Sequence, residues 1–152
     1  MSKSAVEEAR GVQQPSLLKR VQKMLGVRPL RSDQDLVRLV EKRLDIGVLE
    51  RLRQSGLTDD EIYSLIVPRR TLTHRRARHE TLSRDESDRA VRIARIAALG
   101  EYVFGDPERS WHWLRAAKRQ FTGRSPLQLA ATEAGARLVE ELLYRIDEGM
   151  AA

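Results

Sequence analysis

Apolar residues recur at helical spacing along most of this chain, and no stretch shows the strict alternation of a half-buried strand. Two short amphipathic patterns cover residues 16–25 and 32–54, and the second is interrupted at residues 45–47. A wider apolar arc covers residues 90–104, which predicts the central and most buried helix. A last apolar stripe lies in residues 132–148. The pattern predicts an all-α fold.

The spacing also predicts which side chains face the core. The expected core faces are Leu17, Val21, Met24 and Leu25 in the first helix, Leu36, Val37, Val40 and Leu44 in the second, and Val139, Leu142, Leu143 and Ile146 in the last. Ser32 is the expected N-cap of the second helix. Because the first helix is too short to be stable alone, it must pack on the body, on a second copy or on a partner.

Capping signals mark where several helices begin. Three capping boxes are expected, at Thr58 with Glu61, Ser83 with Glu86, and Ser125 with Gln128. Asp106 followed by Pro107 is an N-cap with proline at the first helical position. We expect the helix that starts there to carry Trp111 and Trp113, one in the core and one near an interface, and to end near residues 121–123.

Residues 57–80 predict a helix-turn-helix. A capped helix leads to a turn at Val67 and Pro68, and a second helix rich in arginine follows. Few carboxylates lie within four positions of these arginines, which favours DNA contact over a solvated surface. By the usual docking of such a helix, Arg69, Arg70, Thr71 and His74 meet bases, Arg75, Arg76 and Arg78 meet phosphates, and Thr73 belongs to the same DNA-binding set.

Composition supports a binding protein. The 152 residues carry 28 Lys and Arg against 22 Asp and Glu, so the net charge of +6 favours a polyanionic partner. There is no cysteine and no apolar run long enough for a membrane span, so a cytoplasmic protein is expected. The three histidines match no metal-ligand spacing, and no phosphate loop or nucleophile motif is present. We expect no enzymatic activity, no metal and no cofactor.

Residues 123–149 leave two interpretations open. A patch of small residues precedes and opens the acidic last helix, and comprises Ala130, Ala131, Ala134, Gly135 and Ala136. One interpretation is an ordinary helical hairpin that closes the core. The other is a protein contact surface, because small residues let another backbone approach closely and a glycine near a helix start costs stability.

Six short motifs then give the chain a family resemblance. They occur in the order PxRTL, LSxxESDR, VFGD, WL, GR(S/T)PL and GARxVEELL, and they lie within residues 57–152. In this order the motifs resemble the Xre/ParS/MbcA antitoxins, which are paired with RES-domain toxins in bacterial type II toxin–antitoxin modules. The resemblance implies an Xre-like helix-turn-helix that binds the operon's own promoter. It also implies a C-terminal region that covers the active site of an NAD-consuming RES toxin.

The resemblance further implies where this chain is divided and where it meets the toxin. The expected domains are a basic extension with one amphipathic helix (1–31), the helix-turn-helix region (32–81) and the helical toxin-binding region (82–152). The implied toxin-binding residues are Gly123, Arg124, Ser125, Pro126, Leu127, Glu133, Gly135, Arg137, Glu140, Glu141 and Leu143. Expected partners are the RES toxin and operator DNA.

Two further questions stay open at the level of sequence. A homodimer would match a two-fold operator, and either the helix with Leu17, Val21 and Leu25 or the small-residue surface could form its contact. The alternative function is a stand-alone helix-turn-helix regulator whose C-terminal helices only dimerise. A second alternative is a structural or adaptor protein in which the arginines are a solvated surface.

Overall fold

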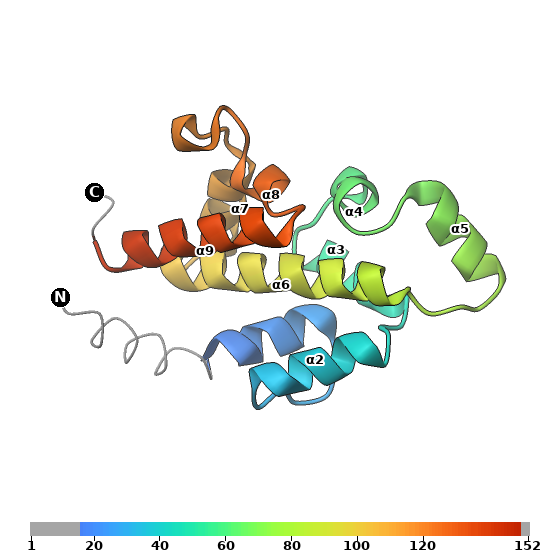
Figure 1. Ribbon diagram of the computed structural model, residues 1–152. Coiled ribbons are helices and arrows are strands. Elements are labelled where there is room, and N and C mark those ends of the chain that lie inside the picture. The colour runs from blue at the N-terminus through green and yellow to red at the C-terminus, as the bar shows by residue number, and fades with distance from the viewer. Residues whose placement is uncertain (1–15, 150–152) are drawn as a thin grey trace.

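The computed structural model describes residues 16–149, and these form only helices and turns (Figure 1). After the helical residues 16–25, the elements are α2 (Asp33–Glu41), α3 (Gly47–Gln54), α4 (Asp59–Leu65), α5 (Arg69–Ala77), α6 (Arg84–Phe104), α7 (Pro107–Arg115), the 3-10 turn η1 (Arg119–Phe121), α8 (Pro126–Leu129) and α9 (Glu133–Asp147). Residues 1–15 of the expected basic extension lie outside the described residues. The predicted all-α fold is confirmed.

The 21-residue helix α6 is the centre of the molecule. It packs against α2 on one side and against α7 and α9 on the other, while α4 and α5 lie toward the end where α6 begins (Figure 1). Its apolar residues are buried nearly all round, as the wide apolar arc predicts. Because one core cluster includes side chains from both flanks, α6 joins the two halves of the fold.

Local capping chemistry sets the helix starts as predicted. In the capping boxes at Thr58, Ser83 and Ser125, the hydroxyl accepts from the backbone N–H three residues later, and the Glu or Gln there accepts in return. Asp106 caps α7 by accepting from the Arg109 N–H at 3.0 Å. Ser32 is the N-cap residue of α2 but makes no such bond, and Asp35 accepts from the Arg31 N–H at 2.8 Å. That backbone hydrogen bond is the main cause of the lowered pKa of Asp35.

Helix α7 is shorter than predicted. It ends at Arg115 because Ala116 is extended, with ψ 133°, and the chain turns away from the helix. The following loop closes on itself: the Lys118 N–H donates to the Arg124 carbonyl, and the Gly123 N–H donates to the Lys118 carbonyl, both at 3.0 Å. This loop, residues 118–124, projects from the body above α7 and α8 (Figure 1).

The core faces of the two N-terminal helices are partly different from the predicted ones. Leu18, rather than the half-buried Leu17, joins Val21 in the core. The first helix therefore packs on its own chain, and Val21 and Leu25 are unavailable for a dimer contact. In α2, Val37 was predicted to be buried but is 56% exposed. No described helix is long and apolar enough to cross a bilayer.

The small-residue patch closes the chain's own core. Ala130, Gly135 and Ala136 are buried, whereas Ala131 and Ala134 are exposed. A Cβ built at Gly135 would overlap the Leu129 carbonyl oxygen and lie 2.8 Å from the carbonyl carbon. The glycine therefore provides room for the end of α8 against the start of α9. Of the two interpretations left open by the sequence, the helical hairpin is the one observed for these buried residues.

Candidate functional site

Helices α4 and α5 form a helix-turn-helix at one edge of the fold (Figure 1). The link between them, residues 66–68, is anchored by the buried side chains of Ile66 and Val67. Leu72 is the one buried residue of α5. Since a single side chain anchors this nine-residue helix in the core, most of its surface remains available for a partner.

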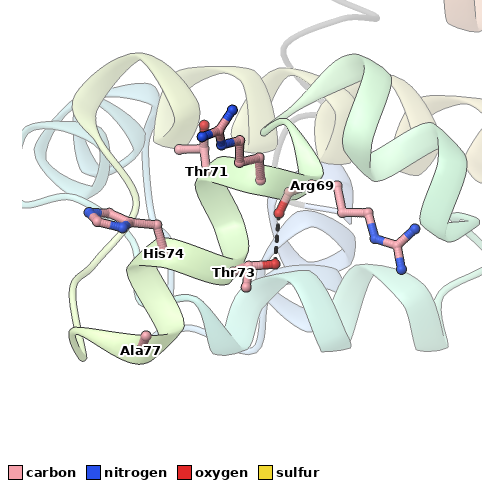
Figure 2. Close-up of a pocket in the computed structure, with 6 residues that line it drawn as sticks. Arg69, Thr71, Thr73, His74 and Ala77 are labelled. Atoms are coloured by element: carbon pink, nitrogen blue, oxygen red, sulfur yellow. Dashed lines mark hydrogen bonds between the residues drawn. The ribbon is translucent and has the colours of Figure 1, made fainter.

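The outer face of α5 is open and basic. A shallow surface groove is lined by Arg69, Arg70, Thr71, Thr73, His74 and Ala77 (Figure 2). The groove lining contains no carboxylate, and Figure 2 shows the Arg69 and His74 side chains pointing away from each other. The Arg69 guanidinium lies over the ring of Tyr63 on α4, 5.9 Å from its centroid. The Thr73 hydroxyl donates to the Arg69 carbonyl at 3.0 Å.

The arginines of this segment fall into two groups. Arg70, Arg76 and Arg78 are exposed and form no ion pair within the described part of the chain. Arg75 differs, because its side chain is only 22% exposed and pairs with Glu80 and Glu86. Both carboxylates lie more than four positions from Arg75, five and eleven residues further along the chain. Arg75 is thus already engaged within the chain, unlike the other arginines of this segment that were predicted to meet phosphates.

The predicted toxin-binding residues also fall into two groups. At the surface are Gly123 and Arg124 in the projecting loop, and Glu133, Arg137, Glu141 and the half-buried Glu140 on α9. Inside the chain's own core are Ser125, Pro126, Leu127, Gly135 and Leu143. In this conformation the buried five cannot touch a partner. They hold α8 and α9 in place beneath the exposed six.

The carboxylates along one flank of α9 face arginines of α6. Arg92 binds Glu133 at 3.2 Å and also donates to the Ala131 carbonyl. Arg95 lies 3.9 Å from Glu140. Burial is the main cause of the raised pKa of Glu140, since Arg95 only partly offsets it. This flank is therefore tied to α6 by ion pairs, but Glu133 keeps 68% of its side chain exposed and Glu140 keeps 29%, so both remain accessible beside the outward face of α9.

Sequence reasoning missed Leu138, which lies in the middle of that outward face. It is 50% exposed, and Arg137, Glu141 and Ala134 are its exposed neighbours on α9. Its exposed apolar area could be buried by a partner that covers this face of α9. The sequence already indicated this exposure, because Leu138 does not lie on the helix face formed by Val139, Leu142, Leu143 and Ile146.

A cluster of polar contacts joins α7 to the start of the helix-turn-helix. The Trp111 indole N–H donates to the Ser55 carbonyl at 2.8 Å, and Trp111 is buried as one of the two tryptophans was predicted to be. Arg115 stacks on the Trp111 ring at 4.8 Å and pairs with Glu61 at 2.8 Å. Burial would raise the pKa of Glu61, but hydrogen bonds from Arg115 and from the Thr58 backbone outweigh it, and the pKa is lowered.

The second tryptophan is half-buried beside the projecting loop. Trp113 packs against Phe104 with ring centroids 5.5 Å apart, and the Lys118 ammonium lies 4.9 Å from the Trp113 ring centroid. Burial lowers the pKa of Lys118. No group of three His, Asp or Glu side chains within residues 16–149 is placed to hold a metal ion.

Two family models match this chain. Residues 35–95 match the antitoxin Xre-like helix-turn-helix domain, and residues 99–149 match the antitoxin Xre/MbcA/ParS C-terminal toxin-binding domain. The two matches meet inside α6, the helix shared by both halves of the core. The first match includes α4 and α5, and the second includes the projecting loop and α9.

Two relatives carry the same name. An antitoxin Xre of Pseudomonas putida is 35% identical over 130 residues, which cover 86% of this chain and 82% of the relative. An antitoxin Xre of Yersinia enterocolitica is 32% identical over 85 residues, 55% of this chain and 57% of the relative. The chain belongs to the Xre/MbcA/ParS family of antitoxins.

Proposed function

We propose that this antitoxin neutralises a cognate NAD-consuming RES-domain toxin by binding over its active site, and represses its own operon by binding operator DNA. The observation that carries the proposal is the placement of two separate exposed surfaces on one rigid core. The basic face of α5 suits DNA, and the projecting loop with the outward face of α9 suits a protein. Such a type II antitoxin acts in the cytoplasm, where the toxin and the operon are found.

The DNA-binding surface is proposed to divide by position on α5. Arg69, Arg70, Thr71, Thr73 and His74 near the start of the helix are proposed to meet base edges. Arg76 and Arg78 at its end are proposed to meet phosphates, because both are exposed and unpaired within the described residues. Arg75 is left out of this set.

Replacing Arg70 and Arg76 together with glutamine is expected to weaken DNA binding strongly. The proposed phosphate contact of Arg76 is lost, so the slope of log K against log salt should fall by about 1 in magnitude, and the lost base contact of Arg70 should cost a further ~1–3 kcal/mol of binding free energy. The measurement is fluorescence anisotropy with a duplex from the region immediately upstream of the gene, at several salt concentrations. Arg124→Gln is the matched control, because it removes an exposed arginine from the projecting loop instead. An unchanged slope in the double variant would contradict the assignment of α5.

The toxin-binding surface is proposed to centre on the outward face of α9 and on the adjoining loop. Its proposed contact residues are Gly123, Arg124, Glu133, Arg137, Glu140 and Glu141, with Leu138 added. Removal of residues 132–152 would be a poor test, because it would also remove Val139 and Leu143 from the core. Point variants on the surface avoid that problem.

Leu138→Asp is expected to abolish protection against the toxin while leaving the fold intact. A charge at the apolar centre of a contact should lower toxin affinity by about 30-fold, the size expected for a central interface residue. The test is growth rescue when the antitoxin and the product of the adjacent gene are co-expressed, followed by titration of the purified pair. Val37→Asp is the matched control, since Val37 is the other exposed large apolar residue in the described chain and lies on α2. Equal rescue by both variants would exclude this face.

A homodimer inside a larger toxin–antitoxin complex is proposed from the two-fold symmetry of most operators read by helix-turn-helix proteins. Neither surface considered from the sequence is wholly free for it, because Val21 and Leu25 of the first helix are buried in the chain's own core. Of the five small residues, Ala130, Gly135 and Ala136 are buried as well, and Ala131 and Ala134 are exposed. Co-purification with the product of the adjacent gene distinguishes the proposed antitoxin from a stand-alone regulator.

A further inference from the structure

The first two turns of α6 contact three separate parts of the helix-turn-helix region. The Ser87 hydroxyl accepts from the Leu44 N–H at 2.8 Å, and the Leu44 carbonyl accepts from the Leu82 N–H at 2.9 Å, just before α6. The Arg89 Nε donates to the carbonyl of Ile66, in the turn between α4 and α5, at 3.0 Å. The start of α6 thus holds both the segment before α3 and the turn.

The third contact is made by Glu86 and reaches α5 itself. Glu86 is 4% exposed and accepts from the Ser83 N–H at 2.8 Å as its half of the capping box. The same carboxylate pairs with Arg75, with 2.8 Å between Nε and Oε1 and 3.2 Å between the second terminal nitrogen and Oε2. One buried side chain therefore both starts α6 and ties α5 to it.

Helix α5 has few other attachments. Leu72 is its one buried residue, and a single apolar contact leaves a short helix free to tilt or rotate. A second contact three residues along the helix limits that freedom, because the Arg75 guanidinium makes one hydrogen bond to Glu86 and a close Nε–Oε1 ion pair to the same carboxylate, and together these restrict its orientation. The two contacts together define the direction in which Arg70 and His74 point.

We propose that Glu86 and Arg75 are positioning residues that set the orientation of α5, and that Arg75 supports DNA readout without touching DNA. The proposal rests on the proposed DNA-binding function. It gives the LSRDESDR stretch, residues 82–89, a physical role: its Ser83, Glu86, Ser87 and Arg89 side chains cap α6 and hold the helix-turn-helix against it.

A single substitution separates positioning from simple charge attraction. Glu86→Gln keeps the capping box, because glutamine serves at that position as well, but removes the anion that binds Arg75. The protein becomes more positive by one charge beside the DNA-binding helix. Charge attraction alone therefore predicts tighter DNA binding, whereas loss of positioning predicts weaker and less specific binding.

The experiment compares the full chain with Glu86→Gln, Arg75→Gln and the double variant, with Arg76→Gln as the phosphate-contact control. Affinity is measured over a salt series for the upstream duplex and for a random-sequence duplex of equal length. We expect the affinity of all three positioning variants for the upstream duplex to fall by about tenfold, which is the effect of one mismatched base pair in the site. Their salt slope should match wild type, while Arg76→Gln should lower the slope by about 1 in magnitude.

Wild-type or tighter binding by Glu86→Gln would overturn the proposal, and so would a reduced salt slope in Arg75→Gln. Thermal unfolding followed by circular dichroism checks each variant. The double variant leaves no unpaired buried charge, so it tests the proposal if a single variant fails to fold. If the wild-type protein shows no salt-dependent binding to either duplex, the proposed DNA-binding function itself is wrong. If the wild-type protein binds and Glu86→Gln binds equally well, only the positioning role is wrong.

Discussion

Gly135→Ala is expected to unfold the C-terminal hairpin, with a loss of at least about 3 kcal/mol in the free energy of unfolding. The added Cβ would overlap the backbone carbonyl of Leu129, and a backbone atom cannot rotate away as a flexible side chain can. To relieve the overlap, α8 would have to separate from α9. The helix-propensity gain of about 1 kcal/mol for alanine over glycine is too small to offset this.

Urea unfolding at neutral pH measures the effect of the Gly135 substitution. Ala134→Ser is the matched control, because Ala134 is the preceding residue, is exposed and should change stability by no more than about 0.5 kcal/mol. Binding of the adjacent gene product should be lost with Gly135→Ala and kept with the control. A Gly135→Ala protein as stable as wild type would show that the Leu129 carbonyl is not fixed where the structure has it.

Trp111→Ala is expected to cost about 3–5 kcal/mol and to loosen the contact between α7 and the helix-turn-helix. Three interactions disappear together: packing in the core, the indole bond to Ser55 and the stacking of Arg115. Gly56 is packed closely against this ring, since a Cβ there would lie 2.8 Å from the Trp111 Cδ1. The space left by alanine is therefore bounded by backbone, which limits collapse.

Trp111→Phe separates the hydrogen bond from the packing. This variant retains an aromatic ring, and its free energy of unfolding should fall by about 1 kcal/mol because the hydrogen bond to Ser55 is lost. The Ser55 carbonyl, left without this donor, should add a further loss. Trp113→Phe is the control, because Trp113 is half-buried beside the projecting loop and, within the described residues, makes no hydrogen bond to the helix-turn-helix region. Both are measured by urea unfolding. If Trp111→Ala were no more destabilising than Trp113→Phe, the α7 contact would not be a main support of the fold.

The charge pair next to this tryptophan adds a pH dependence of known sign. The pKa of Glu61 is lowered in the folded chain, so its contribution to stability is present above the unfolded pKa of a glutamate. It is lost as pH falls through the folded pKa. The link between the two halves of the molecule therefore weakens in acid.

Features that depend on a few neighbouring residues were predictable from the sequence. Each capping box is completed within four residues, and the turn before α5 needs only the local sequence, so helix starts at Thr58, Ser83 and Ser125 were assigned correctly. The wide apolar arc likewise identified α6 as the central helix, because burial on all sides leaves few polar positions. The family motifs identified both matched domains.

Features that depend on distant segments could not be read from local spacing. The end of α7 and the exposure of Val37 depend on which other segments of the chain pack against them. The same holds for Leu127 and Leu143, which were implied to contact the toxin and are buried in the core. A residue of a type common at interfaces becomes part of the core when its own chain folds over it.

The arginine segment shows the division most directly. The sequence by itself determined the short capped helix, the turn and the basic second helix, since those follow from neighbouring residues. Only the tertiary structure separated Arg75 from Arg70, because Glu86 lies eleven positions away and reaches Arg75 only when α6 folds back beside α5. Two arginines with the same charge therefore have different surroundings in the folded chain. Arg75 is paired with Glu86, whereas Arg70 is exposed and available to a partner.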